Sequence, residues 1–600
     1  MKLLKFYATI SIILFANILP VQTIKIDGNS FLENQTKHDS IIVVFERIAP
    51  SALKDTSYTD IDGHFSHTIP SGIYNIKYSK SGYIDILLTG RPLYSNTILP
   101  DTILESIGLS GHLSGTLSPD TYKIGGNIKI NNGDTLTISP GTIFKFKGNL
   151  TFEINGLLIA DGKKYDSIIF TANDTSQCWG GIKFNNSNSN SRMSYCKVEK
   201  SDSCGVHIFN TSPYLHNMTI NDNKHLNLTE NNIGDDGGGG IYFENSNTIL
   251  DSVIITNNFC TVGGGIYCKS GYPQIKNSII SKNGVFYEGG GAYLFSGSNI
   301  SFENVKITDS YSINNYEKNA DGIDGRYFSK CRVTNSLIAN NQGRGIAVTS
   351  DASNNSQIDI INSIIYNNLR DGIYFFDTKI NVTNSIIADN KEYGIDYSSF
   401  QTCTFDHIAN NNVYNNSYDN YNHCSQWVGK NVTVNANADS CDAYYNIQKN
   451  PMFVDALNED FHLQGESPCI DAGVNDSLRC AFDLGNNNRI YDGNNNGIAT
   501  VDIGAYEFGS ISVSIKNDHK FKNNFINIYP NPAHTSLTIE TNHLAKECTL
   551  TISNINGQEI KRQQIRNSRT RIDVSDLTSG VYFVKLISDK EIEVRKIIIE

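Results

Sequence analysis

The chain has 600 residues, a formal net charge of −12 at pH 7 and a pI near 5.6. Only 18% of its residues are charged, and no basic stripe is present that would release counterions from a phosphate backbone, which excludes nucleic acid as a partner. The length exceeds one ordinary domain, so we expect a modular chain or a long solenoid.

Residues 1–22 have the features of a secretory signal peptide. Lys2 and Lys5 provide a positive start, and the apolar run Phe6–Leu19 follows. Such a segment directs export and is then removed. No later stretch reaches the roughly 18–20 apolar residues that a spanning helix needs, so we expect no transmembrane span after signal removal.

Residues 24–100 alternate polar and apolar residues in short runs that end at turn glycines, which predicts β-strands. The segment Tyr58–Tyr83 contains D-x-x-G-x-F, then P-x-G-x-Y, then a Gly-Tyr pair. In this it resembles the carboxypeptidase-regulatory-like (transthyretin-like) module. The resemblance implies a small β-sandwich that acts as a spacer or docking platform and has no catalytic role.

Residues 108–509 contain a repeated pair of phrases. One phrase has the type NSIISKN (Asn277–Asn283), and the other has the type GGGIYC (Gly263–Cys268). We use as a marker the last glycine before the Ile-Tyr-type strand of each second phrase; in one copy this marker is Gly325. Most intervals between successive marker glycines are 20–27 residues. A period of this size with no helical pattern predicts a coiled parallel sheet. The region resembles right-handed parallel β-helix proteins.

Strand alternation assigns directions to the residues of each coil. The first and third residues after the marker glycine are apolar and should point inward, whereas the second should point outward. The Asn-Asn pair that ends the first phrase should form a turn, because asparagine tolerates left-handed backbone. We expect each of these asparagines to hydrogen-bond to its counterpart one coil away, about 4.8 Å along the axis.

Two resemblances at the far end of the chain concern export. Within residues 450–509, the pieces FVD, DFHL, SPCIDAG and VDIGAYEF resemble the end module of choice-of-anchor β-helix proteins. After a linker at residues 510–524, residues 525–600 resemble the C-terminal sorting domain of the type IX secretion pathway of Bacteroidetes-type bacteria. The motifs are INIYPNPA (Ile526–Ala533), TISNINGQEI (Thr551–Ile560), DLTSGVYFVKL (Asp576–Leu586) and VRKIIIE (Val594–Glu600). The resemblance implies a small β-sandwich, the type IX machinery as partner, and a protein that is secreted or attached to the outer surface of the outer membrane.

A column of tyrosines is the first candidate site. The outward position after the glycine would place phenol rings in successive coils, where they stabilise one another or offer a stacking surface for sugar rings. Either a structural stack or a glycan platform follows from this pattern. The tyrosines concerned are Tyr242, Tyr267, Tyr293, Tyr327 and Tyr374.

A charged series is the second candidate. Asp324, Arg344 and Asp371 each stand one step before a glycine, so we expect a ladder in which the arginine lowers the pKa of both carboxyl groups. Polysaccharide lyases need acidic and basic residues, and glycoside hydrolases need paired carboxylates, which makes these three residues candidate catalytic groups as well. The sequence motifs typical of β-helix pectinases are otherwise mostly missing from this chain.

A calcium site and a disulfide are weaker candidates. Asp492, Asn494 and Asn496 have the spacing of the first half of a calcium loop, and Asp502 is the nearest later acid; the alternative is a plain turn. No cofactor is required on this evidence, and calcium is the one ion that the spacing permits. Export allows disulfides, and Cys469 with Cys480 is the predicted pair among twelve cysteines; the alternative is that the cysteines are buried small apolar residues.

The sequence therefore predicts an all-β protein in which a right-handed parallel β-helix is flanked by an N-terminal and a C-terminal small β-sandwich. Two functions remain open. The first is a non-catalytic, adhesin-like protein that binds an extracellular glycan or a host or biofilm surface. The second is a polysaccharide lyase or glycoside hydrolase that acts on an extracellular polysaccharide. The absence of a recognisable catalytic set favours the first.

Overall fold

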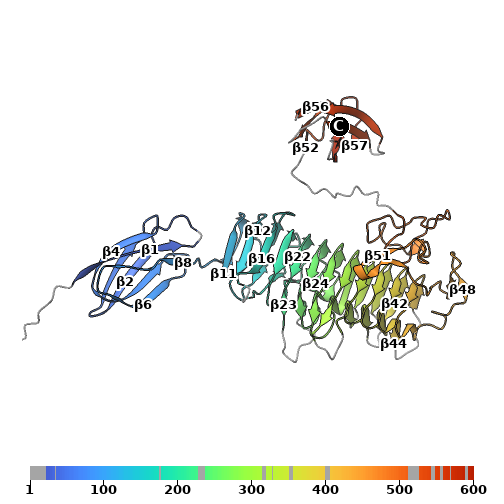
Figure 1. Cartoon of the computed structure of the whole chain (residues 1–600), viewed down its shortest axis with the longest axis horizontal. Helices are drawn as coiled ribbons and strands as arrows, with labels where there is room; N and C mark the ends of the chain where they lie inside the picture. Colours follow the sequence, from blue (N-terminus) through green and yellow to red (C-terminus); the bar gives the residue numbers. More distant parts are fainter. Residues whose placement is uncertain are drawn as a thin grey trace, which may run out of the picture. The chain divides into compact units, whose positions relative to one another are not determined.

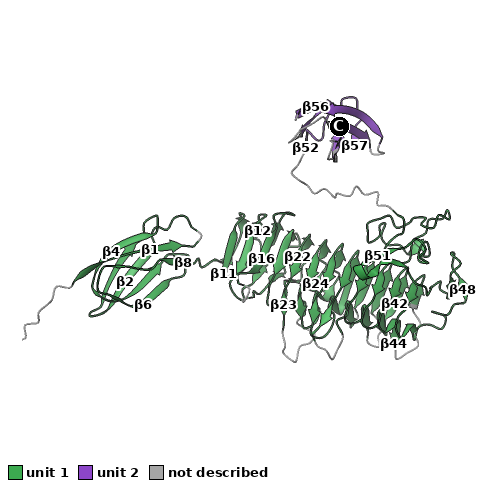
Figure 2. Ribbon diagram, in the orientation of Figure 1, with its two compact units in different colours: residues 1–512 green, residues 513–600 purple. Residues whose placement is uncertain are grey.

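The structure is a computed structural model of the chain. It describes residues 22–33, 35–174, 178–226, 237–313, 319–327, 329–350, 356–398, 406–510, 526–541, 548–554, 558–565, 567, 569–587 and 592–599. The predicted signal peptide and the predicted linker lie almost wholly outside the described residues and stay predictions. The chain divides into two compact units, residues 1–512 and 513–600 (Figure 2).

The first unit begins with a small β-sandwich over residues 23–104. One sheet has the order β4-β1-β7 with β8 also paired to β1, and the other has the order β3-β2-β5-β6. The core between them includes Phe45, Phe65, Tyr74 and Tyr78. The strands are β1 (Thr23–Leu32), β2 (Ile42–Ala49), β3 (Leu53–Tyr58), β4 (His64–Pro70), β5 (Gly72–Ser79), β6 (Ile86–Leu93), β7 (Thr97–Ile98) and β8 (Thr102–Leu104).

A β-helix built from three parallel ladders follows, here called ladders A, B and C in the order in which each coil visits them (Figure 1). Two long strands, β11 (Thr121–Ile130) and β32 (Ala292–Glu303), each contribute to two ladders. Ladder A also contains β13 (Ile143–Phe146), β16 (Ile168–Ala172), β19 (Cys196–Glu199), β22 (Thr219–Asn221), β26 (Ile254–Thr256), β30 (Ile279–Ser281), β33 (Lys306–Thr308), β37 (Leu337–Ala339), β40 (Ile364–Tyr366), β43 (Ile386–Ala388) and β46 (Asn412–Tyr414).

Ladders B and C complete each coil. Ladder B contains β9 (Leu109–His112), β14 (Phe152–Ile154), β17 (Ile182–Asn185), β20 (Val206–Phe209), β24 (Ile241–Ser246), β28 (Ile266–Gly271), β35 (Ile323–Arg326), β38 (Ile346–Thr349), β41 (Ile373–Phe376), β44 (Tyr393–Ser398) and β47 (Asp419–Asn422). Ladder C contains β10 (Gly115–Leu117), β12 (Thr135–Ile138), β15 (Leu157–Asp161), β18 (Arg192–Ser194), β21 (Tyr214–His216), β25 (Ile249–Asp251), β29 (Gln274–Lys276), β36 (Lys330–Thr334), β39 (Gln357–Ile361), β42 (Lys379–Thr383) and β45 (Asp406–Ala409). A fourth, short ladder lies between A and B in consecutive coils and consists of β23 (Lys224–His225), β27 (Phe259–Cys260), β31 (Gly284–Val285) and β34 (Tyr311–Ser312).

The asparagine phrase forms the turns on either side of ladder A. Its first asparagine adopts positive φ, for example 49° at Asn277 and 58° at Asn335, which asparagine tolerates better than most residues. Its last asparagine is buried and donates from Nδ2 to Oδ1 of the counterpart in the next coil, as at Asn258 and Asn283 (3.1 Å) and at Asn341 and Asn368 (2.9 Å). The predicted asparagine ladder is therefore present, and it pairs amides that would otherwise be buried without partners.

The coils of the β-helix occupy only part of the predicted region 108–509, whose last part, from about residue 450, is predicted to be an end module. The three ladders end at Asn422, and Val428 from the following segment covers the last coil. That segment holds β48 (Thr433–Val434) and β49 (Ser440–Cys441). Residues 453–508, with β50 (Phe453–Asp455), η1 (Ala456–Asn458), β51 (Asp460–Leu463) and η2 (Asn475–Ser477), do not continue the coil.

Residues 453–508, here called the end module, instead lie along the outside of ladder A. They bury the outward side chains Leu337, Ile364 and Ile386 in a second hydrophobic cluster. Gly504 donates its backbone N–H to the Asn384 carbonyl at 2.8 Å and has a φ of 114°. This φ favours glycine, and a Cβ here would also lie 2.7 Å from Ile386 Cδ1 at the packed surface of ladder A.

The second unit contains two antiparallel sheets, with strand orders β52-β53-β56 and β55-β54-β57-β58, around a core that includes Leu550, Val584 and Ile597. The strands are β52 (Ile526–Tyr529), β53 (Ser536–Thr541), β54 (Cys548–Asn554), β55 (Glu559–Ile565), β56 (Arg569–Asp573), β57 (Gly580–Ile587) and β58 (Ile592–Ile599). The predicted fold class, a right-handed parallel β-helix with a small β-sandwich at each end, is confirmed. In the described part of the chain, no helix is long and apolar enough to cross a membrane.

Candidate functional site

The outer face of ladder B holds most of the residues that the sequence singled out. Consecutive strands place one outward residue of each coil directly beside that of the next. From β17 to β47 this column reads Lys183, His207, Tyr242, Tyr267, Tyr293, Asp324, Ala347, Tyr374, Asp396 and Asn422.

Three of the predicted tyrosines form a stack. The ring of Tyr242 meets that of Tyr267 edge-on at a centroid distance of 4.8 Å, and Tyr267 stacks on Tyr293 at 5.6 Å. His207 extends the row by stacking on Tyr242 at 4.4 Å. These separations lie in the range in which aromatic pairs attract.

The stack is buried, so the prediction of an exposed glycan platform at Tyr242, Tyr267 and Tyr293 is wrong. Their exposed fractions are 6%, 0% and 6%, because a satellite hydrophobic cluster with Cys204 and Val262 encloses them. The structural alternative, a self-stabilising stack, describes these three residues.

The glycine triplets explain how the chain covers the rings. The first glycine of each triplet, Gly238, Gly263 and Gly289, has a φ between 66° and 85°. A Cβ on these glycines would lie 3.1, 3.0 and 2.8 Å from the Cβ of Tyr242, Tyr267 and Tyr293 respectively. The backbone therefore runs against each tyrosine at a distance that only glycine permits without displacement.

Tyr327 and Tyr374 do not join the stack. Tyr327 is 54% exposed and lies outside the column, because the glycine that aligns with Gly291 and Gly345 is Gly322 and not Gly325. The outward residue of that coil is consequently Asp324. Tyr374 does occupy the column, half-buried beneath the guanidinium of Arg344, whose Cζ lies 4.3 Å from the ring centroid.

The alignment on Gly322 instead of Gly325 also changes which residues form the predicted charged series. The residues one step before the aligned glycines are Asp321, Arg344 and Asp371, so Asp321 takes the place predicted for Asp324. Arg344 Nε donates to Asp371 Oδ2 at 3.0 Å, and the Arg344 backbone N–H donates to Asp321 Oδ1 at 2.6 Å. The predicted ladder exists with Asp321 in place of Asp324, but the expected lowering of the carboxyl pKa values does not hold for Asp321.

Asp324, which lies in the column, belongs to a second charged cluster with Arg326 of the adjoining column. Arg326 Nε donates to Asp324 Oδ1 at 2.9 Å, and its NH2 group donates to Glu288 Oε1 at 2.9 Å. Arg326 stands two residues after Asp324 on the same strand, so both side chains lie on the same face. The Asp-x-Arg spacing is present in the sequence, but the use of Gly325 as the marker glycine hides that both side chains share a face.

Burial dominates the electrostatics of this face. It raises the pKa of Asp321 to about 8, against the opposing effect of Arg344, and Asp324 adds to the rise. Burial likewise raises the pKa of Asp396, with Asp371 contributing. Asp321 has no exposed surface, so it cannot contact a substrate even though its pKa is close to neutral.

The predicted calcium residues do not come together. Asp492 accepts backbone N–H groups of Asn496 (3.0 Å) and Gly497 (2.8 Å), which is the arrangement of a plain turn. Asp502 is buried and accepts from the backbone N–H groups of Asp471 (2.7 Å) and Phe508 (2.6 Å), so it does not complete the loop. Within the described residues, no cluster of three or more His, Cys, Asp or Glu side chains could hold a metal ion.

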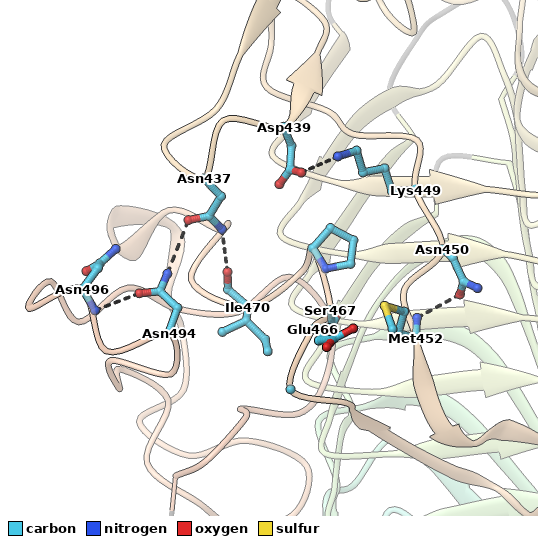
Figure 3. A pocket seen from close by; sticks show the side chains of 12 residues that line it. Asn437, Asp439, Lys449, Asn450, Met452, Glu466, Ser467, Ile470, Asn494 and Asn496 are labelled. Carbon is cyan, nitrogen blue, oxygen red and sulfur yellow. Dashed lines mark hydrogen bonds and ion pairs between the residues drawn. The ribbon is translucent and has the colours of Figure 1, made fainter.

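Asn494 and Asn496 line a cavity of about 790 Å³ between the end module and the segment that covers the last coil (Figure 3). Asn437 bridges its walls by donating to the Ile470 carbonyl at 2.7 Å, and Lys449 pairs with Asp439 at 2.5 Å. The polar side chains that line this cavity are therefore largely paired with other groups of the protein.

The predicted disulfide between Cys469 and Cys480 is not formed, and both are free thiols. Cys469 is buried, where it accepts a hydrogen bond from Asn412 Nδ2 at 3.1 Å. Cys480 lies instead beside Glu303; burial, and after it the charge of Glu303, raises the pKa of this thiol to about 11. Asn412 and Glu303 belong to coils several turns apart, which explains why neighbours in sequence do not pair.

A groove that sequence reasoning missed lies where the end module meets ladder C. Its volume is about 450 Å³, and its walls include Tyr272, Gln274, Ser301 and Arg332 from the coils and Arg479 from the end module. Tyr272 is 60% exposed. The groove depends on the folding back of residues 453–508, for which no repeat pattern gives a signal.

Comparisons with known proteins identify two regions. Residues 527–600 match the family described as secretion system C-terminal sorting domain, and residues 219–359 match the family described as right handed beta helix region. No curated protein matches the chain. The predicted resemblances to a carboxypeptidase-regulatory-like module and to a choice-of-anchor end module stay predictions.

Two solved structures show weak likeness. A pectate lyase, Pel9A, is 16% identical, with a TM-score of 0.35 and coverage of 63% of this chain and 89% of its own. The A-module of the Azotobacter vinelandii mannuronan C-5 epimerase AlgE6 is 13% identical, with a TM-score of 0.30 and coverage of 56% and 91%. Likeness at this level supports no conclusion about activity. The two family matches establish a right-handed β-helix protein that type IX secretion delivers to the cell surface or the extracellular space.

Proposed function

We propose that this type IX-secreted β-helix protein is a non-catalytic, adhesin-like protein that binds an extracellular glycan along its coils. The observation that carries the proposal is the groove beside ladder C, which combines an exposed aromatic ring with polar side chains from successive coils. An aromatic ring can stack on the apolar face of a sugar, while side-chain amides, hydroxyls and guanidinium groups can bond to its hydroxyls.

The state of ladder B supports a non-catalytic role. A general acid or base must come within hydrogen-bond reach of its substrate. Asp324 and Asp371 are buried and already accept hydrogen bonds from Arg326 and Arg344. Asp371 is paired with Arg344 of the preceding coil. Asp324 is paired with Arg326 of its own strand, so both carboxylates have the geometry of structural ion pairs.

Retention on immobilised polysaccharides tests the proposal. We expect the full chain to be retained on at least one polysaccharide of a panel of acidic and neutral types. Tyr272→Ala should be released roughly 10-fold more readily, a loss comparable to the about 1–3 kcal/mol that aromatic stacking contributes for nucleic-acid bases. Tyr214→Ala is the matched control, because Tyr214 is 41% exposed on the same ladder outside the groove. Failure of the panel to retain the wild-type protein contradicts the proposal.

A polysaccharide lyase or glycoside hydrolase is the second candidate. It is favoured by the gathering of Asp371, Asp396 and Arg344 on one face, with Asp396 retaining 16% side-chain exposure. Incubation of the protein with the same polysaccharides and calcium, followed by measurement of unsaturated ends and chain length, distinguishes the two functions. Asp161→Asn, on the distant outer face of ladder C, is the control. If Asp396→Asn abolishes the products and Asp161→Asn leaves them unchanged, the protein is an enzyme and the non-catalytic proposal is overturned.

A further inference from the structure

We propose that the groove beside ladder C is a binding site for anionic sugar residues, with Arg479 as the group that selects the negative charge. This inference rests on the proposed glycan-binding function and adds the class of ligand. It follows from the arrangement of the groove and from the charges along its walls.

The coils supply a regular floor. Gln274 in β29, Ser301 in β32 and Arg332 in β36 are register partners in three consecutive coils. Adjacent strands lie about 4.8 Å apart, so an amide, a hydroxyl and a guanidinium group are presented in a row along the β-helix axis. Such a row can contact successive units of an extended chain that runs parallel to the axis.

One side of the groove is aromatic. Tyr272 stands two residues before β29 and is held by its backbone N–H, which donates to the Ser246 carbonyl at 3.0 Å and lies 2.9 Å from Asn247 Oδ1. The backbone of the residue is thus anchored to the preceding coil while its ring stays 60% exposed. An anchored, exposed ring provides contact area with little loss of conformational entropy on binding.

Arg332 and Arg479 carry the positive charge of the groove, and Glu303 also lines it. Arg332 donates to Asp359 Oδ2 at 3.1 Å, and Lys276 lies 3.8 Å from Glu303, so these two cations have acidic partners. Arg479 is exposed, and its one hydrogen bond in the described structure is a long one of 3.5 Å to the Leu478 carbonyl. No carboxylate of the described residues pairs with Arg479. The groove therefore has a cation in excess within a protein whose net charge is −12.

An unpaired arginine beside an exposed ring favours a carboxylate or a sulfate on a sugar. The planar guanidinium can donate two parallel hydrogen bonds to either group, which a neutral sugar cannot match. A charged hydrogen bond contributes about 1.5–3 kcal/mol, which corresponds to roughly 10-fold or more in affinity. The net charge of −12 disfavours non-specific binding of an anionic ligand to the rest of the protein.

The test uses the full chain and three soluble probes: polygalacturonate, its methyl-esterified form, and a neutral galactan. We expect polygalacturonate to bind at least 10-fold more tightly than the other two, and Arg479→Gln to abolish that preference. Arg192→Gln is the matched control, because Arg192 is an exposed arginine on ladder C that already pairs with Asp161 at 2.7 Å. A sulfated galactan as a further probe distinguishes sulfate from carboxylate as the recognised group.

The outcomes separate this inference from the proposed function. If polygalacturonate and galactan bind equally, with a loss in Tyr272→Ala but none in Arg479→Gln, the anionic preference is overturned while glycan binding stands. If Arg192→Gln weakens polygalacturonate binding as much as Arg479→Gln does, the attraction is diffuse and the assigned site is overturned. If none of the probes and none of the panel polysaccharides binds, both proposals fall.

Discussion

The outer faces of ladders B and C differ in what covers them. Ladder B gathers four tyrosines, four aspartates and two arginines, yet three of the tyrosines lie under glycine-rich backbone, and Asp324 and Asp371 are held in ion pairs. Ladder C carries fewer such residues, but Tyr272 and Arg479 are exposed beside it. A high density of aromatic and charged residues on one face of a coil therefore indicates a binding or catalytic site only where their side chains remain accessible.

Removal of a ring from the covered stack should have the largest effect. We expect Tyr267→Ala to lower the free energy of unfolding of the β-helix by about 3–5 kcal/mol, because the ring is fully buried between Tyr242 and Tyr293. Tyr214→Ala, on the open ladder, should change it by no more than about 0.5 kcal/mol. Urea unfolding followed by fluorescence measures both, since Trp179 is buried against Phe146 in the core. Equal losses in the two variants would contradict the covered stack.

Ladder A allows the same comparison within one column. Ile364 lies under the end module and is 1% exposed, whereas Ile279, three coils earlier in the register, is 40% exposed. Ile364→Ala should destabilise by about 2–5 kcal/mol and Ile279→Ala by well under about 1 kcal/mol. The midpoint of urea unfolding tests this, and a small effect at Ile364 would show that the end module does not pack on ladder A.

The covered face should also show a distinctive dependence on pH. The pKa of Asp321 is raised to about 8 from an ordinary 3.8, so between these values the folded protein keeps a proton that the unfolded chain has released. Its contribution to stability is complete below about pH 4 and is lost as the pH rises through about 8, by at most about 1.4 kcal/mol per pH unit.

Asp321→Asn isolates this contribution. The wild-type protein should lose stability relative to the variant as the pH rises from 4 to 8, in urea unfolding measured at each pH. Other buried acids, such as Glu507, titrate in both proteins, so the difference between the two curves reports Asp321 alone. A constant difference across this range would show that Asp321 is ionised in the folded protein.

The smallest effect on stability should come from the open groove. Tyr272→Ala and Arg479→Gln remove exposed side chains and should each change the free energy of unfolding by less than about 0.5 kcal/mol, even though we expect both to weaken glycan binding. Unfolding curves recorded beside the binding curves check this. A large loss of stability in either variant would mean that its loss of binding reports damage to the fold.

Much of the fold could be predicted because the repeat expresses it locally. The asparagine at each turn, the alternating apolar residues and the period of the glycines all follow from the short-range geometry of a strand and a left-handed turn. The buried bonds between Asn341 and Asn368 and their counterparts are a direct consequence. Where the period became irregular, the prediction went wrong by three residues, at Gly325 instead of Gly322.

The candidate site was harder to predict because accessibility is a property of distant segments. Whether Tyr267 is exposed depends on backbone at Gly237 and Val262, and whether Ile364 is exposed depends on residues beyond 450. The groove at Tyr272 likewise needs Arg479, about 200 residues later in the chain. Alternation along a strand predicts that a side chain points outward but not what packs upon it.

Hydrogen exchange in the presence of saturating polygalacturonate shows which face of the β-helix meets a glycan. We predict added protection in the segments of ladder C that carry Tyr272, Gln274 and Ser301, and in the end module around Arg479, with no change in β41 and β44. Protection confined to β41 and β44, where Tyr374 and Asp396 lie, would contradict the account and place the functional face on ladder B.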